Sequence, residues 1–432
     1  MSINISISNL AKIRKADVKI NGLTVISGEN DTGKSTVGKA IYSIIKSINT
    51  YSTSGAYDIK LGLIHEMYDT LKLVGRAINR RTPTFNKIRS KVSSYIRRPF
   101  MLFSENDDML SEDLYRKKIN NLTFQELSEL MIELFKYAKK KEYWNDSIIR
   151  NKLEKLSKIV ENYQDEKIQL STNLLLEFQS CIGNILVNSE HPEEDGQISL
   201  SLQDKEVLKF HFNKDILLVQ KYNKQNFDYI FDDATYIETP LLINEEFDLR
   251  YDSRSSFADI INKKKSAQNP VQKKIDYITK YIPGEIDFKN DKFSYKVSPL
   301  AVELALSSMA SGVKSFNILQ LLAQGGYIGG VSKLLIVDEP ENHLHPEWQL
   351  RYAELIVSLV AQGANIILTS HSPYMIQALY YYAKRTSLDE NKIAFYYTEK
   401  TDIKNYTEIK ETKDLSIIFD KLSKPLERIV WD

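Results

Sequence analysis

Apolar and polar side chains alternate at the N-terminus of the chain, and this alternation predicts β-strands. Ile3, Ile5 and Ile7 are each separated by one polar residue. A period of two places every second side chain on the same face of a sheet, where it can be buried. We expect residues 1–27 to form strands, and the largely apolar run 23–26 to be the last and most buried of them.

A helical spacing begins soon after this strand region. Apolar residues recur every three or four positions, as they do along the buried face of a helix, and they are Val37, Ala40, Ile41, Ile44, Ile45 and Ile48. Two later apolar runs, 334–337 and 365–368, are short and continuous. Such runs are typical of parallel strands that are buried on both faces. The pattern predicts an α/β fold.

The middle of the chain has a different pattern. Residues 53–195 are mainly helical in their spacing, and a short apolar seam there indicates a helical hairpin, formed by Leu153, Leu156, Val160 and Tyr163. Residues 196–254 alternate with a period of two and predict several antiparallel strands. A helix over 255–282 and a hairpin that turns at 290–291 are expected to follow.

We therefore divide the chain into four parts. Residues 1–52 are the first part of an α/β head, 53–195 a helical insertion, 196–254 an antiparallel strand region, and 255–432 the second part of the head. With 432 residues, the chain is long enough for one large domain with an insertion of this kind.

Composition excludes several classes of protein. The formal net charge is +1, so no overall field drives binding to nucleic acid or to a membrane. The single cysteine, Cys181, excludes an internal disulfide and a cysteine zinc cluster, and its apolar surroundings in sequence indicate a buried side chain rather than a reactive thiol. No signal-peptide pattern and no apolar run of about 18 residues is present. We expect a soluble, cytoplasmic protein with no membrane partner.

The clearest motif lies between the predicted strand and the predicted helix. The segment 28–36 reads Gly-Glu-Asn-Asp-Thr-Gly-Lys-Ser-Thr and fits the phosphate-binding P-loop pattern G-x-x-x-x-G-K-[ST]. Its N–H groups can bind phosphate at a helix N-terminus, where the helix dipole favours an anion. The alternative, an ordinary glycine turn, is disfavoured by the flanking strand and helix. We predict that ATP contacts Asn30, Asp31, Thr32, Gly33, Lys34, Ser35 and Thr36.

A P-loop needs an acidic partner at the end of a neighbouring strand. The apolar run 334–337 is followed directly by Asp338 and Glu339. We expect Asp338 to hold Mg²⁺ together with the Ser35 hydroxyl, directly or through water. Glu339 can take a proton from the attacking water. The alternative is a buried strand that ends in two surface acids, and the P-loop disfavours it.

A candidate histidine follows the second apolar run. The segment 369–373 reads Thr-Ser-His-Ser-Pro, and we expect His371 to contact the terminal phosphate, although a purely structural histidine is the alternative. Glu341, His343 and His345 also suggest a zinc cluster. That cluster is disfavoured because two histidines two residues apart cannot share a helix face and no other ligands lie near.

A second helix start carries serine and glycine. The segment 307–315 reads Ser-Ser-Met-Ala-Ser-Gly-Val-Lys-Ser and precedes an apolar helical run. Serine can cap a helix at this position, and the free N–H groups there can bind an anion. Taken alone, the segment fits an ordinary N-cap as well as a second phosphate-binding terminus.

These motifs, in this order, resemble the ABC-type ATPases. The run Asp-Glu-Pro-Glu-Asn-His-Leu-His-Pro at 338–346, followed by Thr-Ser-His-Ser-Pro at 369–373, is similar to the branch that contains the Rad50, RecF and overcoming-lysogenisation-defect proteins. The resemblance covers residues 1–50 and 284–400. It implies an ABC-type P-loop ATPase head with a mixed sheet and a helical insertion, and ATP and Mg²⁺ as its ligands.

The resemblance also implies residue roles across a dimer. The signature segment with Ser308, Ser311 and Gly312 would close on ATP that is bound to a partner subunit. Asn342 and His343 would form the D-loop of that interface, and the resemblance makes His371 the switch histidine.

The chain departs from this family at the signature segment. The usual Leu-Ser-x-Gly reads Met309-Ala310-Ser311-Gly312, so an alanine replaces the serine that normally contacts the γ-phosphate. Substitution by Ser311 or by Ser308, or slow hydrolysis, would each fit this departure. No glutamine can be assigned to the Q-loop, and the adenine contacts are unassigned.

Many relatives carry a TOPRIM nuclease after the switch histidine, and we expect none in residues 372–432. The chain is similar to stand-alone ATPase subunits of two-gene bacterial anti-phage systems such as Septu and PARIS. This implies a homodimer or higher homo-oligomer around ATP and a separately encoded nuclease or toxin effector.

A DNA-binding repair ATPase like RecF is the alternative. Its candidate surface is the basic, aromatic stretch 137–144, which also reads as a solvated helix end. The motifs and the insertion disfavour a transporter subunit.

Overall fold

The structure is a computed structural model of the full chain. It describes residues 3–53, 64–65, 67–74, 83–95, 118–119, 122, 124–139, 150–151, 166–183, 186–214, 216–223, 231–238, 278, 284–289, 292–297, 302–305, 309–324, 326–328 and 332–431. The chain divides into two compact units. One comprises Met1–Lys46 and Leu174–Asp432, and the other comprises Ser47–Asn173.

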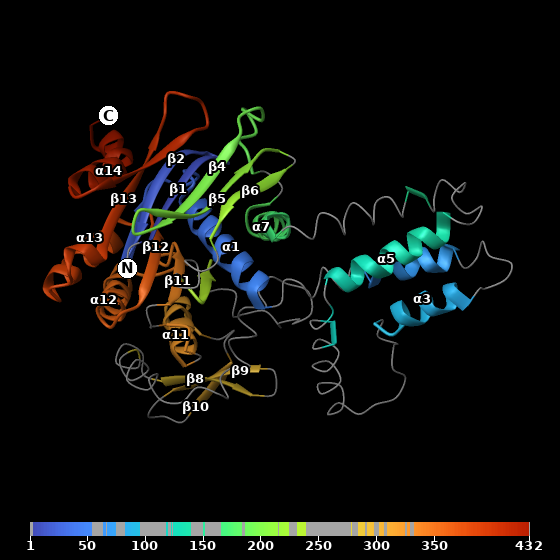
Figure 1. The fold of residues 1–432 in the computed structure, drawn as a ribbon. Coiled ribbons are helices and arrows are strands. Elements are labelled where there is room, and N and C mark those ends of the chain that lie inside the picture. Colours follow the sequence, from blue (N-terminus) through green and yellow to red (C-terminus); the bar gives the residue numbers. More distant parts are fainter. Residues whose placement is uncertain are drawn as a thin grey trace. The chain divides into compact units, whose positions relative to one another are not determined.

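The first unit contains an 11-stranded sheet with the order β6-β5-β4-β1-β2-β14-β13-β3-β12-β11-β7 (Figure 1). It starts with β1 (Ile3–Leu10) and β2 (Ile13–Ile20), which pair antiparallel. Every second residue of β1 is buried up to Ile7, as the alternating pattern predicts. The next strand, β3 (Leu23–Ser27), is buried along its whole length. The strands predicted for residues 1–27 therefore form.

The strands at the β7 end of the sheet are parallel. β11 (Lys333–Asp338) pairs with β12 (Asn365–Ser370) and with β7 (Asp233–Ile237), and β3 lies between β12 and β13 (Ile393–Lys400). These pairs are all parallel, so the carboxyl ends of the strands meet at one edge of the sheet. The P-loop, Asp338 and His371 all follow strands of this group, and the topology therefore brings them to the same edge.

The antiparallel strand region is part of this sheet. β4 (Gly196–Leu202) pairs antiparallel with β1, and β5 (Lys205–Phe212) and β6 (Leu217–Tyr222) extend the sheet beyond β4. The expectation of a separate region at 196–254 therefore needs a correction. Its first strands pair with the N-terminal strands and extend their sheet, and β7 is a parallel strand beside β11.

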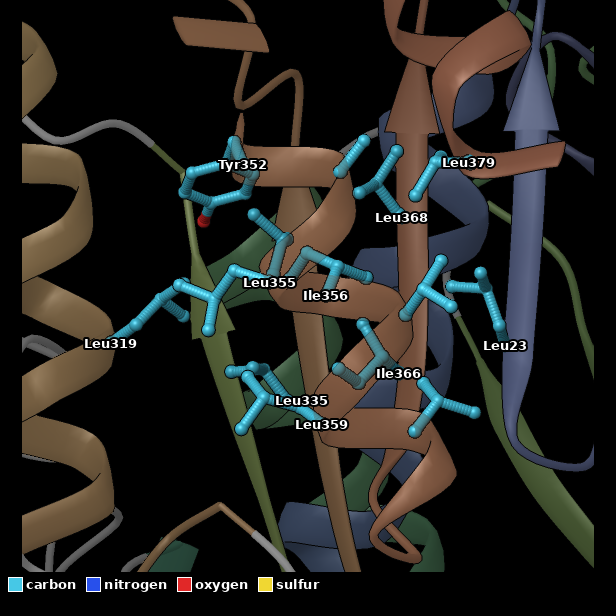
Figure 2. Packing of buried hydrophobic residues seen from close by; sticks show 14 of the residues in the cluster. Leu23, Leu319, Leu335, Tyr352, Leu355, Ile356, Leu359, Ile366, Leu368 and Leu379 are labelled. Atoms are coloured by element: carbon cyan, nitrogen blue, oxygen red, sulfur yellow. The ribbon is translucent and has the colours of Figure 1, made fainter. Parts of the chain in front are cut away.

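Helices cover both faces of the parallel strands. α1 (Lys34–Thr53) packs on one face, where a Cβ atom added to Gly38 would lie 3.0 Å from the side chain of Ile336. The opposite face carries α11 (Ser311–Gln324), α12 (Pro346–Ala361), α13 (Pro373–Arg385) and the first turn of α14 (Ser416–Trp431). Figure 2 shows the packing of Leu355, Ile356 and Leu359 of α12 against Leu335 and Ile366 of the strands.

Local capping explains where two of these helices begin. His345 accepts a hydrogen bond from the N–H of Glu347 at the start of α12, and Ser372 accepts one from Met375 at the start of α13. Each cap is followed by a proline, whose missing N–H costs nothing at the first helical position. Both helices therefore begin directly after the loops that carry the candidate site residues.

A smaller sheet accompanies the first unit. β8 (Gly284–Lys289) pairs with β9 (Lys292–Val297), and β9 pairs with β10 (Val302–Ala305); both pairs are antiparallel. The register joins Lys289 with Lys292, which agrees with the hairpin turn predicted at 290–291. β14 (Thr407–Thr412) completes the large sheet between β2 and β13. A short helical turn, η5 (Glu390–Lys392), precedes β13.

The second unit is helical where it is described. It includes α3 (Pro83–Ser93) and α5 (Phe124–Lys139), and α7 (Glu166–Ile182) crosses the boundary to the first unit. The insertion expected at 53–195 corresponds to this unit, although its contact boundaries are Ser47 and Asn173. The predicted seam at 153–163 and the helix at 255–282, apart from Ile278, lie outside the described residues.

The aromatic, basic stretch at 137–144 is described only as far as residue 139. Its first aromatic residue, Tyr137, is buried, and its ring lies 5.6 Å from that of Phe85. This tyrosine therefore packs α5 against α3, and its ring is not exposed for stacking on a nucleic-acid base.

Candidate functional site

The P-loop joins the end of β3 to the start of α1 and is held in a strained, glycine-dependent conformation. Gly28 and Gly33 have φ angles of 156° and 85°, in the region that favours glycine. A Cβ atom on Gly28 would lie 1.8 Å from the hydroxyl oxygen of Thr398, and one on Gly33 would lie 2.9 Å from the side chain of Ile13. Both glycines are therefore needed for close packing of the loop on its neighbours.

Other P-loop residues tie the loop to the sheet and leave its outer part accessible. Thr32 is buried; its hydroxyl donates to the Glu29 carbonyl at 2.7 Å and accepts from Thr398 at 2.9 Å. Asn30 and Asp31 are exposed, and Asp31 forms an ion pair with Lys12. Thr36 is half-buried in the first turn of α1.

Lys34 points back over its own loop. Its side chain is 3% exposed, and its Nζ donates to the Glu29 carbonyl oxygen at 2.7 Å. The same nitrogen lies 3.3 Å from Oε1 of Glu339. The P-loop lysine and the carboxylate after β11 are therefore in direct contact, and the fold brings these two distant motifs together.

Asp338 lies at the centre of a buried hydrogen-bond network. Its Oδ1 accepts hydrogen bonds from the hydroxyl of Ser35 at 2.9 Å and from the hydroxyl of Thr369. Its Oδ2 accepts one from the hydroxyl of Tyr236 at 2.8 Å. Asp338 is only 8% exposed, so β11 does not end in a surface acid at this position. Every oxygen of this carboxylate is oriented by a donor from another element.

Tyr236 is a site residue that the sequence analysis missed. It lies on β7, one residue before the C-terminal end of that strand. Burial and then the nearby charge of Asp338 raise the pKa of Tyr236 well above its ordinary value. Because the phenol keeps its proton, it is a permanent donor to Asp338. No motif surrounds Tyr236, and only the parallel pairing of β7 with β11 reveals it.

Glu339 lies in the left-handed region, with φ of 45°. Its N–H donates to the Thr369 carbonyl at 3.2 Å and its Oε2 accepts from the Asn342 side chain at 3.3 Å. Burial raises the pKa of Glu339, but the charges of Lys34 and then His371, with hydrogen bonds from Lys34 and Asn342, lower it below its usual range overall. Glu339 is therefore ionised and held beside the P-loop lysine.

His371 follows β12 and reaches the same carboxylates. Its Nδ1 lies 3.5 Å from Oε1 of Glu339 and 3.2 Å from Oε1 of Glu341. The side chain is 36% exposed, so one edge of the ring faces solvent and can meet a ligand. Lys34, Glu339 and His371 thus form one continuous group of charged side chains at the carboxyl edge of the parallel strands.

The residues of the signature segment are only partly described. Ser308 lies outside the described residues, and Ser311 is the first residue of α11. Gly312 lies against Leu344 and Trp348, because an added Cβ would be 3.3 Å from Leu344. This small residue permits close packing of α11 on the loop before α12.

The residues of the loop before α12 have distinct environments. Asn342 contacts Glu339 of its own chain, and His343 is exposed with φ of 65°. His345 caps α12. Among the described residues, no group of three histidine, cysteine or acidic side chains is placed to hold a metal ion.

The donor set nevertheless fits a magnesium ion that is also bound to phosphate. Mg²⁺ uses one or two protein oxygens and completes its coordination with water and phosphate oxygens. Ser35 Oγ and Asp338 Oδ1 are 2.9 Å apart and lie at the N-terminus of α1. These are the oxygens that would hold the ion, and Thr369 and Tyr236 would orient them.

A sequence profile of the AAA ATPase domain matches residues 1–376. The chain belongs to this family. Together with the P-loop after β3 and the acidic end of β11, this match identifies an α/β P-loop ATPase domain. No helix among the described residues is both long and apolar enough to cross a membrane.

One curated relative is similar over a short segment. The Septu protein PtuA of Bacillus thuringiensis is 35% identical over 101 residues. The match covers 21% of this chain and spans only 25% of that relative.

Solved structures with some similarity include two SMC heads. The SMC head domain from Thermotoga maritima has a TM-score of 0.40 at 10% identity, with 95% of this chain and 98% of that chain covered. The SMC head bound to the C-winged helix domain of ScpA has a TM-score of 0.42 at 10% identity, with 96% and 98% covered.

Proposed function

We propose that this protein binds Mg·ATP at the P-loop and hydrolyses it. The observation that supports this most strongly is the contact group formed by Lys34, Ser35, Asp338, Glu339 and His371, which come from three different strand ends. Phosphoryl transfer depends mainly on positioning and charge, because the protein has little covalent chemistry to perform. This group offers one cation for phosphate, one metal carboxylate, one proton acceptor and one histidine.

Each side chain has a distinct role in this proposal. The N–H groups of the loop and Lys34 bind the phosphates, and Ser35 and Asp338 hold Mg²⁺. The ion, when bound, supplies positive charge to the phosphate oxygens. Glu339 accepts a proton from water.

The test compares two adjacent carboxylates. Glu339→Gln should bind Mg·ATP with normal or higher affinity, because it frees Lys34 from an ion pair and removes no metal ligand. Its single-turnover hydrolysis should fall by about 10²–10⁴-fold, the usual cost of losing a general base. Asp338→Asn should instead weaken the magnesium-dependent part of ATP binding. Calorimetric titration and phosphate release in single-turnover mixtures measure both effects.

Equal, near-background phosphate release from wild type and Glu339→Gln would contradict the hydrolytic role. The protein would then use ATP only as an assembly ligand. Ala310, which stands where the family has the phosphate-contacting serine, would account for that result.

We further propose that ATP-bound subunits associate and control a separate effector, a nuclease or toxin, in defence against phage. This is supported by the motif order and by the segment similar to PtuA of Bacillus thuringiensis. The test is a plaque assay in cells that carry this gene with its genomic neighbour. Protection should require both genes, and Lys34→Ala should abolish it. Full protection without the neighbour would contradict an effector encoded there.

A further inference from the structure

Glu341 is a buried carboxylate without a role in the chemistry proposed above. It lies in the loop between β11 and α12, and its side chain is 3% exposed. Its Oε1 accepts a hydrogen bond from the Ser370 hydroxyl at 2.8 Å and another from the N–H of His371 at 2.7 Å. The Nδ1 atom of His371 lies 3.2 Å from the same oxygen. Three polar atoms of the loop after β12 thus converge on one carboxylate oxygen.

Burial of the Glu341 carboxylate is energetically unfavourable. Its second oxygen, Oε2, is buried and has no hydrogen-bond partner among the described residues. Burial raises the pKa of Glu341 above the usual carboxyl range, although the hydrogen bonds and the charge of His371 partly offset this. A buried charge that is only partly satisfied does not add stability in comparison with an apolar side chain. The arrangement therefore points to a task at His371.

We propose that Glu341 is a positioning residue for His371. Nδ1 makes no hydrogen bond among the described residues, but it lies 3.2 Å from the Oε1 of Glu341, whose charge favours a proton on this inward-facing nitrogen. This leaves Nε2, across the ring, available to a terminal phosphate. The negative charge of Glu341 also offsets the positive charge that the ring carries when Nε2 holds a proton to donate. The consequence for turnover rests on the proposed ATP hydrolysis, whereas the ring geometry does not.

Glu339 is the other described carboxylate near this ring. Its Oε1 is 3.5 Å from Nδ1, but the same oxygen faces Lys34 at 3.3 Å and its other oxygen accepts from Asn342. Glu339 therefore has partners of its own in Lys34 and Asn342. Glu341 has no lysine or arginine ion pair among the described residues, and its Oε1 accepts hydrogen bonds from Ser370 and from the N–H of His371, so it is the stable anchor.

A hydrogen-bond chain extends this anchoring to the next helix. The N–H of Ser372 donates to Ser370 Oγ at 3.0 Å, and the Ser372 hydroxyl donates to Gln349 Oε1 at 2.6 Å. The amide of Gln349 in turn donates to the carbonyl of Leu344 at 3.0 Å. The loop that contains Glu341 and Leu344 and the loop of His371 are thus fixed to each other at both ends. A shift of either loop changes where the imidazole points.

The test uses two substitutions at Glu341 and one control. Glu341→Ala removes the acceptor. Glu341→Gln keeps an oxygen at the Oε1 position and removes the charge. Glu347→Gln changes an exposed carboxylate of the same region, which forms an ion pair with Arg351. The first readout is long-range ¹H–¹⁵N NMR of histidine-labelled, nucleotide-free protein, with His371 assigned by its loss in His371→Gln. The second readout is ATP affinity and the single-turnover rate.

In wild type and Glu347→Gln, Nδ1 of His371 should carry a proton in both the neutral and the positively charged imidazole. Glu341→Ala should lose this preference and hydrolyse ATP at least about 10-fold more slowly, with ATP affinity within about twofold of wild type. Glu341→Gln should restore the ring state and part of the rate. If Nδ1 of His371 carries no proton in the neutral ring of the wild-type protein, the proposal is wrong. This result needs no variant, so the proposal can still be tested if Glu341→Ala folds poorly. Absent hydrolysis in wild type would refute only the ATPase function, and the ring state would still decide the role of Glu341.

Discussion

At the scale of single residues, Lys34 is the side chain on which nucleotide binding depends most. It is buried, and its ammonium group already bridges the loop carbonyl of Glu29 and the carboxylate of Glu339. Lys34→Ala should abolish ATP binding, or weaken it at least about 100-fold, because no neighbouring cation can replace a point charge on the phosphates. Calorimetry with Mg·ATP measures this. Lys209→Ala, on β5, is the matched control and should bind normally. Unchanged affinity in Lys34→Ala would remove the P-loop from the site.

Tyr236 provides the second prediction for a single residue. Tyr236→Phe removes the hydroxyl that donates to Asp338 Oδ2 at 2.8 Å and keeps the ring, which lies 5.9 Å from that of Tyr42. Loss of a group that orients a metal ligand typically costs about 10–100-fold in metal affinity. We expect a loss of this size in the magnesium dependence of ATP binding. Tyr42→Phe should not cause it. Equal magnesium dependence in wild type and Tyr236→Phe would show that Ser35 and Thr369 are sufficient to orient Asp338.

Sequence reasoning identified the residues that follow strands in recognisable motifs, and it missed their partners. Asp338, Glu339 and His371 could be predicted because each lies within three positions of the end of a short apolar run. Tyr236 is 102 positions from Asp338 and belongs to no motif. Glu341 was considered only as a zinc ligand, because its burial against Ser370 depends on how two loops pack. Periodicity reports which face of an element is buried, but not which distant side chain lies there.

At the scale of elements, Glu399 connects β13, β14 and α14. Hydrogen bonds from Lys410 and then Lys421 lower the pKa of Glu399 to about 2. A lowered carboxyl pKa contributes stability above the unfolded pKa of about 4.5, and this contribution is lost as the pH falls toward 2. Glu399→Gln should therefore be less stable than wild type at pH 7, and the difference should shrink between pH 5 and pH 3.

Urea unfolding followed by circular dichroism at pH 7, 5 and 3 measures this difference. Glu411→Gln, at an exposed position of β14, is the control and should show little change at any of these pH values. A deficit of Glu399→Gln that is independent of pH would mean that packing, and not charge, holds these elements together. Because Glu399 is itself partly exposed, the expected effect is modest.

The elements were easier to predict than their order in the sheet. The strands at 23–26, 334–337 and 365–368 were recognisable from continuous apolar runs, and they form β3, β11 and β12. The pairing of β4 with β1 was not predictable, since it joins residues almost 200 positions apart, such as Ile5 and Leu200. Both strands alternate between buried and less buried residues, and nothing in a period of two indicates which strand is the partner.

At the scale of the whole molecule, the open question is whether one chain contains a complete site. The described contacts gather Lys34, Asp338, Glu339 and His371 within one subunit. The resemblance to ABC-type ATPases assigns Ser311 and Gly312 to the site of a partner subunit. Gly312 packs against the loop before α12 in its own chain, so the signature segment is built onto the same framework as the D-loop residues.

Mixing two inactive variants tests this assembly. In Lys34→Ala the phosphate-binding cation is missing, and in Gly312→Asp a carboxylate repels phosphate from the signature segment. If each site combines the P-loop of one subunit with the signature segment of the other, both pure variants are inactive, but a mixed dimer has one site with both wild-type parts. Mixing equal amounts should restore up to about a quarter of wild-type turnover, since half of the dimers are mixed and each has one of two sites intact.

Circular dichroism must first show that both variants fold. Light scattering with Glu339→Gln and Mg·ATP should show the dimer itself. Activity in pure Gly312→Asp, or no recovery in a mixture that does dimerise, would mean that each chain completes its own site.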